Sequence, residues 1–236
     1  MSQKSNLYHR HRFPAEIISY CVWLYNTLPL SYRDVEKMML YRGIFVTYES
    51  IREWCKKFGQ QYANQIRRRR LQPGDKWHLD EMNININGKT YYLWRAVDQD
   101  GNVLDILMQS RRDNAAAKKF FRKLLKKQVF APRVIVTDKL KSYSAAKKEI
   151  LKGVEHRQHK RLNNRAENSH QPTRLRERRM RKFKSPGQAQ RFLSAFEFIR
   201  GYFHPKQHLF TAREYRQEMR QRFASWRELT CIEAAA

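Results

Sequence analysis

The chain has 236 residues, which is long enough for one large domain or two smaller ones with their own cores. It carries 49 Lys and Arg against 22 Asp and Glu, a net charge of +27, and its 13% aromatic content argues against a disordered basic tail. Such a charge attracts polyanions, and counterion release favours binding, so nucleic acid is the leading partner. A ribosomal or chromatin protein would share this charge.

Other features of the sequence exclude further classes. No apolar run has the length of a membrane span, and the first residues lack the apolar stretch of a signal peptide. Cys21, Cys55 and Cys231 are odd in number and far apart, so they fit thiols in a reducing cytoplasm and neither a disulfide framework nor a zinc site. No P-loop motif is present, so we expect no nucleotide cofactor.

Amphipathic helices are expected in the first 60 residues. The first has an apolar stripe at helical spacing, namely Ile17, Cys21, Leu24 and Leu28. Ser31, followed three residues later by Asp34, resembles a capping box and opens the second helix. Thr47 is expected to cap a third helix, and Gly59 to follow its last residue, because glycine tolerates the left-handed conformation common there.

Two short helices joined by a glycine-containing turn match the helix-turn-helix plan of DNA-binding proteins. The third helix would then be the recognition helix, with Tyr48, Arg52 and Lys56 on its outer face. The alternative is a plain three-helix bundle with a solvated charged face. The net charge and the connection length favour DNA binding.

A basic linker and a predicted domain boundary follow these helices. Four consecutive arginines occupy positions 67 to 70, and we interpret them as phosphate contacts: Arg67, Arg68, Arg69 and Arg70. Pro73 and Gly74 break the chain, so we expect a helix-turn-helix domain with its linker over residues 1–72 and a second domain over residues 73–184.

Residues 76–109 predict a three-stranded meander around one acidic residue, Asp80. Asn87-Gly88 between two strand-like runs is a strong hairpin signal, because a type I′ turn needs positive φ at both central residues. A two-residue turn at this point places Asp80 opposite Arg95. A carboxylate at such a buried position must be paired, hydrogen-bonded or bound to a metal. On this stretch alone, a cross-strand salt bridge to Arg95 is the favoured interpretation.

A second carboxylate ends the next expected strand. A helix capped by Asp113 or Asn114 runs to about residue 127, and the β-branched run at 133–138 then predicts a buried parallel strand. Asp138 is its last residue, and chemistry in open α/β sheets gathers at the carboxyl ends of strands. The alternative is that Asp138 caps the helix expected over residues 139–150.

A third carboxylate opens a later helix. Asn164 and Glu167 have the spacing of an N-cap and its N3 partner, so Glu167 has either a structural capping role or a functional one. A short strand is expected before it, at residues 154–158, and Pro172 should kink the helix.

The stretch 157–184 is strongly basic. It holds eleven Lys or Arg against two Glu, a bias that a solvated face rarely needs. We interpret the following residues in it as DNA contacts: Arg157, Lys160, Arg161, Arg165, Arg174 and Arg178. Residues 185–236 then form C-terminal helices, and the apolar stripe of the last one packs either on the chain's own core or on a partner subunit.

Together, the three carboxylates predict an α/β fold with chemistry at one sheet edge. The order of elements is βββαβαβα, with Asp80 in the first strand, Asp138 at the end of the fourth and Glu167 on the last helix. This is the ribonuclease-H-like mixed sheet, in which carboxylates bridge two Mg²⁺ ions. Two-metal chemistry needs no side-chain nucleophile.

At these residues the chain resembles the DDE transposases of bacterial insertion sequences, specifically the IS-six family (the IS-twenty-six group). The similar segments are residues 30–36, 77–81, 92–98, 136–139, 155–158 and 162–168. The resemblance implies that Asp80, Asp138 and Glu167 are the catalytic and metal-binding residues, with two Mg²⁺ ions that Mn²⁺ can replace. The 28 residues between Asp138 and Glu167 are fewer than is typical of the family, and Asn168 is the alternative third residue.

The resemblance also implies an activity and partners. An N-terminal helix-turn-helix would read the terminal inverted repeats of double-stranded DNA, and a homodimer would cleave and transfer strands to give cointegrates. The protein would lie in the bacterial cytoplasm, at the nucleoid. Two other functions stay open: a DNA-binding regulator with an inert ribonuclease-H-like domain, and a nuclease without strand transfer.

Overall fold

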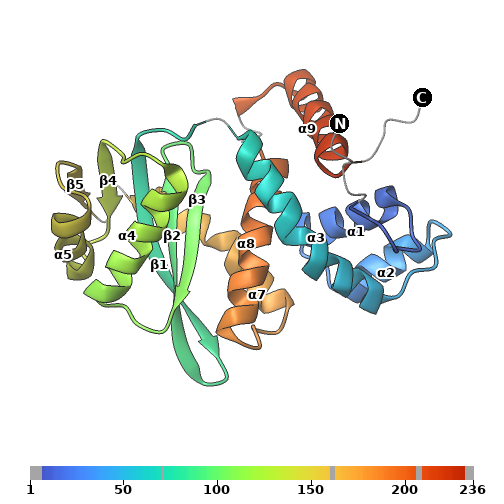
Figure 1. Cartoon of the computed structure of the whole chain (residues 1–236), viewed down its shortest axis with the longest axis horizontal. Coiled ribbons are helices and arrows are strands. Elements are labelled where there is room, and N and C mark those ends of the chain that lie inside the picture. The colour runs from blue at the N-terminus through green and yellow to red at the C-terminus, as the bar shows by residue number, and fades with distance from the viewer. Residues whose placement is uncertain (1–6, 71, 160–162, 206–208, 232–236) are drawn as a thin grey trace. The chain divides into compact units, whose positions relative to one another are not determined.

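The computed structural model describes residues 7–70, 72–159, 163–205 and 209–231. The chain divides into two compact units, residues 1–70 with 195–236, and residues 71–194 (Figure 1). The boundary falls inside α8 (Pro186–Phe203). None of the helices in the described part of the chain combines the length and apolar character needed to cross a membrane.

The unit of residues 71–194 contains a five-stranded sheet and its covering helices. Its elements are β1 (Lys76–Ile86), β2 (Lys89–Asp98), β3 (Val103–Gln109), α4 (Asn114–Gln128), β4 (Val134–Thr137), α5 (Lys141–Ile150), β5 (Glu155–Gln158), α6 (Asn164–Ser169) and α7 (Gln171–Arg179). The strand order is β3-β2-β1-β4-β5, with β1 to β3 antiparallel and with β4 parallel to both β1 and β5. The predicted ribonuclease-H-like fold is confirmed.

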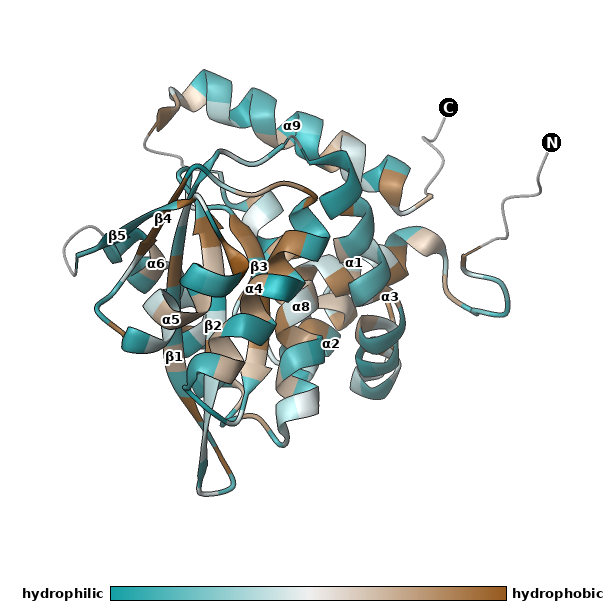
Figure 2. Ribbon diagram, turned by 60° about the vertical axis from the view of Figure 1, so that its left-hand side comes forward, coloured by the Kyte–Doolittle hydropathy of each residue, from teal (hydrophilic) through white to brown (hydrophobic). Residues whose placement is uncertain are grey.

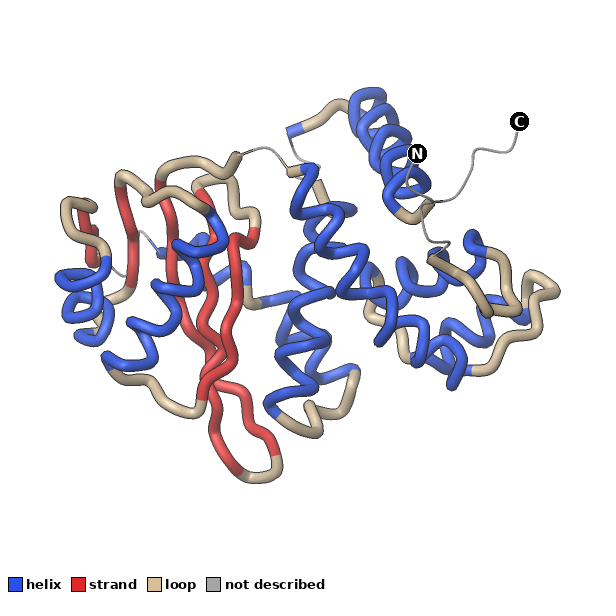
Figure 3. Tube along the Cα trace, in the orientation of Figure 1, coloured by secondary structure: helices blue, strands red, loops and turns tan. Residues whose placement is uncertain are grey.

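The β1–β2 hairpin sets the register of the sheet. Asn87 and Gly88 both have positive φ, 52° and 79°, as a type I′ turn requires. The turn lies at the tip of the long hairpin in Figure 3. Asp80 therefore lies opposite Arg95, as predicted.

The two faces of the sheet have different partners. Trp77 and Leu79 lie on the face that forms the apolar core with α4 and α5, and parts of the central strands are brown, the apolar colour, in Figure 2. Side chains alternate along a strand, so Asp80 points to the opposite face, where α6 packs on β1 and β2. Glu81 then shares the core face with Trp77.

The other unit is helical. It contains α1 (Ala15–Thr27), α2 (Tyr32–Leu40), α3 (Tyr48–Arg69), α9 (Ala212–Leu229) and the second half of α8. Ser31 and Asp34 form the predicted capping box of α2, and the Thr47 hydroxyl caps α3. On α9, the buried Trp226 packs edge-on against Tyr62 of α3, with ring centroids 5.1 Å apart.

The expected end of the third helix at Gly59 is wrong. Helix α3 continues to Arg69, and Gly59 lies inside it and is buried. A Cβ at Gly59 would lie 3.5 Å from the Cβ of Ala195 on α8, so the small residue allows a close helix approach. The glycine marks a packing contact and not a C-cap.

Two capping expectations also need correction. Helix α5 starts at Lys141 after Leu140, so Asp138 is not its N-cap. Helix α6 has Asn163 at its N-cap position, without a capping side chain, and Asn164 is its first residue. The Asn163 amide instead donates to the carbonyl of Leu79, 2.9 Å away, so a tertiary contact replaces the local cap.

Pro172 separates two helices instead of kinking one. Helix α6 ends at Ser169, and Pro172 lies in the first turn of α7. Its missing N–H is tolerated there because the first turn of a helix has no internal partner for that group.

Candidate active site

Three carboxylates meet where β1 passes the end of β4. Strand β4 pairs with β1 only from Lys76 to His78, so Asp138, one residue past β4, comes to lie beside the next residues of β1. Oxygen atoms of Asp80, Glu81 and Asp138 all lie within 4.8 Å of one another. The structure thus brings together two of the three carboxylates selected from the sequence, and adds Glu81.

Asp80 is held on the α6 side of the sheet. Its side chain is 14% exposed, and its Oδ2 lies 3.2 Å from Nε2 of the buried His170. Burial, and after it the charge of Asp138, raise the pKa of Asp80 to about 6. A hydrogen bond from the Glu81 backbone and the charges of Arg112 and Arg95 oppose this rise.

Glu81 lies on the core side, and its charge is enclosed by partners. Its Oε2 accepts a hydrogen bond of 2.6 Å from the hydroxyl of Tyr143, and its Oε1 accepts one of 2.6 Å from Nε of Arg112. Burial raises its pKa to about 7, while the Tyr143 and Arg112 contacts lower it. Burial raises the pKa of Tyr143 well above its usual range.

Glu81 was missed as a site residue. The sequence holds one signal for it: on the alternating pattern it shares a face with Trp77 and Leu79, where a carboxylate is out of place. Its two partners, Arg112 and Tyr143, are 31 and 62 residues away along the chain, so no local sequence pattern predicts these contacts.

Asp138 is fixed by its own turn and by an arginine. Its Oδ1 accepts the backbone N–H of Leu140 at 2.9 Å, which orients the carboxylate after the strand. Its Oδ2 lies 3.6 Å from Nη2 of Arg112. One oxygen of Asp138 lies within 4.8 Å of oxygen atoms of Asp80 and Glu81.

Glu167 is not part of this cluster. It lies on α6, next to the buried Ala166, and its side chain is exposed, as is that of Asn168. The ends of α6 are attached to the sheet: Asn163 bonds to Leu79, and His170 contacts Asp80. Glu167 thus belongs to a helix anchored beside Asp80, while its carboxylate points to solvent.

The side chain of Arg95 is hydrogen-bonded to the junction of α6 and α7. Its side chain is fully buried, and its guanidinium donates to the carbonyl of Ser169 and, at 2.5 Å, to Oγ1 of Thr173. Arg95 lies opposite Asp80 in the sheet, and its side chain contacts the helix junction that carries His170.

The donor set suits a hard divalent cation. Carboxylate oxygens are the ligands that Mg²⁺ and Mn²⁺ prefer, and a few of them suffice because water and phosphate complete the shell. Both oxygens of Glu81 already have partners, so Asp80 and Asp138 are the residues of the cluster best able to bind a metal.

The sequence-selected DNA contacts on α3 have neighbours within the chain. Arg52 and Lys56 are exposed and flank Glu53, at 3.4 and 2.8 Å, and the guanidinium of Arg33 lies 5.1 Å from the centre of the Tyr48 ring. Tyr48 itself is half-buried.

The arginines at the end of α3 differ in environment. Arg67 lies over the ring of Phe198 at 5.0 Å, and Arg69 pairs with Glu228 at 3.0 Å. Arg68 is exposed and Arg70 half-buried.

The selected basic residues of the second unit lie mostly at the surface. Arg157 is exposed and pairs with Glu155 at 2.6 Å. Three further arginines are exposed: Arg165, Arg174 and Arg178. Lys160 and Arg161 lie outside the described residues.

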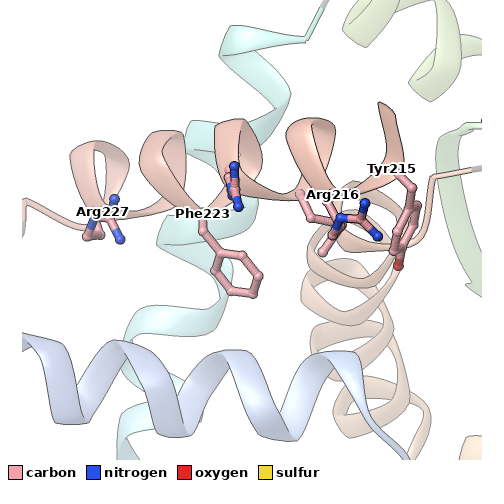
Figure 4. Close-up of a pocket in the computed structure, with 6 residues that line it drawn as sticks. Tyr215, Arg216, Phe223 and Arg227 are labelled. Atoms are coloured by element: carbon pink, nitrogen blue, oxygen red, sulfur yellow. The ribbon is translucent and has the colours of Figure 1, made fainter. Parts of the chain in front are cut away.

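A hollow of about 490 Å³ lies elsewhere, along α9 (Figure 4). Its lining residues all belong to this one helix, and they are Tyr215, Arg216, Met219, Arg220, Phe223 and Arg227. A surface formed by one helix is an open groove, and it contains none of the clustered carboxylates.

Comparisons with known proteins agree with this geometry. A family model described as a DDE domain matches residues 74–206. The transposase for insertion sequence-like element IS431mec of Staphylococcus aureus strain Mu50 is 30% identical over 199 residues, which cover 82% of this chain and 87% of that protein. The Staphylococcus aureus transposase for insertion sequence element IS257 in transposon Tn4003 gives the same identity and coverage.

Two solved structures show weaker likeness. The HTLV-2 integrase catalytic core domain in complex with magnesium has a TM-score of 0.32 at 15% identity, covering 54% of this chain and 99% of that chain. A simian T-cell lymphotropic virus intasome bound to the PP2A subunit B56 gamma has a TM-score of 0.35 at 18% identity, covering 45% and 39%.

The DDE-domain match spans more than half of the chain, and the transposases align over most of it. Membership implies divalent-metal use, which the oxygen donors of Asp80 and Asp138 suit. The chain belongs to the DDE transposases of bacterial insertion sequences, in the IS-six family that includes the IS257 type.

Proposed function

We propose that this transposase binds the terminal inverted repeats of its element and, with Mg²⁺, cleaves and joins DNA strands to give cointegrates. The observation that carries the proposal is the pairing of Asp80 with Asp138 at the end of β4, within 4.8 Å of each other. It supports a shared divalent ion at the sheet edge where phosphoryl-transfer chemistry is expected.

Each proposed ligand has a defined support. His170 and the Leu140 N–H orient Asp80 and Asp138. Glu167, on the anchored helix α6, would complete the ligand set by turning its exposed side chain toward the metal. When bound, two Mg²⁺ ions would supply activation of the attacking oxygen and stabilisation of the leaving oxygen.

The proposed reaction has two balanced steps. In cleavage, the oxygen of a water molecule bonds to phosphorus, the P–O3′ bond breaks, and the 3′ oxygen takes up a proton. The products are a 3′-hydroxyl and a 5′-phosphate. In transfer, that 3′ oxygen loses its proton and bonds to a target phosphorus, and the 3′ oxygen of the target leaves and is protonated. Neither step needs a nucleotide cofactor.

DNA binding would be shared between several basic surfaces. The surface of α3 formed by the exposed Arg52 and Lys56 and the half-buried Tyr48 would read the element ends, in a helix-turn-helix domain of residues 1–72. The exposed arginines of α7, which belongs to the catalytic domain of residues 73–184, would contact phosphates. Residues 185–236 would pack on the core or on the second subunit of a homodimer. The setting would be the bacterial nucleoid.

The test uses purified full-length protein and labelled duplexes that carry the DNA ends flanking the gene. Cleavage and joining are followed with Mg²⁺, with Mn²⁺ and with EDTA. We expect Asp138→Asn to abolish both reactions while end binding persists. Asp75→Asn is the matched control, because Asp75 is an exposed carboxylate that pairs with Arg133 outside the cluster. Cleavage that survives Asp80→Asn, Asp138→Asn and Glu167→Gln would exclude the mechanism.

The exposed position of Glu167 favours one competing function, a DNA-binding regulator with an inert catalytic domain. Such a protein would bind element ends and show no thermal stabilisation by Mg²⁺ or Mn²⁺. A metal-dependent rise in melting temperature that is lost in Asp138→Asn would exclude it.

A further inference from the structure

An arginine lies at the edge of the acidic cluster, in the turn between β3 and α4. The Nε and Nη2 atoms of Arg112 lie 2.6 and 2.5 Å from Oε1 of Glu81, and Nη2 lies 3.6 Å from Oδ2 of Asp138. Its side chain is 41% exposed, so the guanidinium is both anchored and open to solvent. The side chain of its neighbour Arg111 is 82% exposed, and Nη1 of Arg111 lies 4.0 Å from Oδ2 of Asp113.

The anchor of Arg112 is itself fixed. Glu81 has a side chain that is 1% exposed, and its second oxygen accepts the hydroxyl of the fully buried Tyr143. Both oxygens of Glu81 are therefore engaged, which leaves the Arg112 guanidinium little freedom to rotate. A chain of Tyr143, Glu81 and Arg112 runs from the core to the metal-binding edge.

This arrangement is costly if it serves stability alone. Glu81 occupies the core face of β1, where its neighbours are Trp77 and Leu79. Burying an ion pair is often no better than burying well-packed apolar residues. An arginine that served only as the counter-ion of Glu81 would also not need to be partly exposed to solvent. The cost is explained if the exposed donors of Arg112 have a partner that arrives during the reaction.

The incoming group is an anion. A DNA phosphodiester that approaches Asp80 and Asp138 meets two carboxylates, and a fixed cation beside them offsets the repulsion. A guanidinium has five N–H donors, and the bonds to Glu81 use those on Nε and Nη2. Within the described part of the chain the donors on Nη1 have no hydrogen-bond partner, so they are open to a phosphate oxygen, and such bonds are strong because both partners are charged.

We propose that Arg112, held by Glu81 and Tyr143, binds a non-bridging oxygen of the scissile phosphodiester and stabilises the charge that develops there. The proposal rests on the proposed strand-cleavage function. It makes Arg112 a catalytic residue, and Glu81 and Tyr143 its positioning residues. A preorganised cation at this point acts where charge grows, which is the most effective place for electrostatic catalysis.

The test pairs protein variants with single-atom changes in the DNA. The probes are element-end duplexes with one Rp or Sp phosphorothioate at the cleavage position, and single-turnover cleavage is measured in Mn²⁺, which tolerates sulfur better than Mg²⁺. In wild type we expect one isomer to be cleaved about tenfold more slowly than the other, because sulfur weakens the bond from Arg112. In Arg112→Gln this preference should fall below about twofold, and cleavage of the normal duplex should slow about 100-fold.

The controls separate the possible failures. Arg111→Gln should keep the wild-type preference. Each preference is a ratio within one variant, so partial loss of folded protein cancels. Arg112→Lys retains a cation without the fork and should show a reduced preference, which keeps the test open if Arg112→Gln cleaves too slowly to measure. An unchanged preference in Arg112→Gln or Arg112→Lys would overturn the inference. A wild type that cleaves no duplex would instead overturn the proposed function.

Discussion

The imidazole of His170 contacts the carboxylate of Asp80, with Nε2 3.2 Å from Oδ2. His170 is 2% exposed and stands between α6 and α7, so one residue joins the helix that carries Glu167 to the central strand. Its backbone N–H also bonds to the carbonyl of Glu167 at 3.1 Å. The position of Asp80 and that of the Glu167 helix are thus coupled through one side chain.

This coupling predicts a metal-binding defect in His170 variants. His170→Asn places its amide one atom short of Asp80, whereas His170→Gln places an N–H donor at the position of Nε2. We expect the Mg²⁺ concentration for half-maximal thermal stabilisation to rise about 10–100-fold in His170→Asn, as for other residues that orient metal ligands, and to stay near wild type in His170→Gln. Equal Mg²⁺ dependence in the two variants would show that the contact with Asp80 does not orient a ligand.

The raised pKa of Asp80 predicts how the stability of the metal-free protein varies with pH. Its pKa is about 6 in the folded state against an ordinary value of 3.8, so the folded state binds a proton that the unfolded state lacks between these values. This contribution to stability is complete below pH 3.8 and is lost as the pH rises through about 6. Above that, burial of the charge beside Asp138 costs up to about 3 kcal/mol.

Asp80→Asn should therefore stabilise the metal-free protein. In EDTA at pH 8 we expect a gain of about 1–3 kcal/mol in the free energy of unfolding, measured by denaturant titration. The gain should shrink toward zero at pH 4, where Asp80 is protonated in the folded state. Saturating Mg²⁺ should reverse the order of the two proteins at pH 8. A difference that does not vary with pH would contradict the burial of a charged Asp80.

The buried Arg95 predicts a larger stability loss. Its guanidinium bonds to the Ser169 carbonyl and to Thr173, and Arg95→Met would leave these groups without their donor while keeping much of the volume. We expect a loss of about 3 kcal/mol or more, because breaking a buried charged contact leaves its partners unsatisfied. Arg157→Met is the control, since loss of this solvent-exposed pair with Glu155 should change the free energy of unfolding little. Similar small losses in both variants would refute the role of Arg95.

Local signals explain what was predictable from the sequence. Asn87-Gly88 specifies a turn by backbone sterics alone, and the turn fixes the register that puts Asp80 opposite Arg95. The β-branched run before Asp138 likewise identifies a buried strand from a few adjacent residues. Each of these features depends on neighbours in the chain.

Long-range contacts explain what was not predictable. Asn163 was expected to lie before an Asn164 cap, but its amide bonds to Leu79, 84 residues away, and the helix start moves by one residue. Glu81 depends in the same way on Tyr143, 62 residues away. The exposed orientation of Glu167 follows from how α6 is anchored to the sheet, which no spacing of residues reveals.

Because Gly59 lies inside α3 and does not end it, alanine substitutions at Gly59 and at Gly43 should have opposite effects on stability. Gly59 lies inside α3, and a Cβ there would meet only Ala195, at an ordinary contact distance of 3.5 Å. Gly59→Ala should therefore stabilise the protein by about 0.5–1 kcal/mol, because alanine loses less backbone entropy in a helix. Gly43 has φ +72°, and a Cβ added there would meet no described atom within 4 Å, so Gly43→Ala should destabilise by about 1 kcal/mol through backbone strain alone.

Denaturant unfolding of the two alanine variants measures both effects in one helical unit. A lower free energy of unfolding in Gly59→Ala would mean that the added Cβ clashes with Ala195. Helices α3 and α8 would then lie closer together than the 3.5 Å contact indicates. A neutral Gly43→Ala would mean that the turn after α2 relaxes out of the left-handed region. If Gly59→Ala raises the free energy of unfolding and Gly43→Ala lowers it, the backbone requires glycine at position 43 and not at position 59. Only Gly43 has a positive φ.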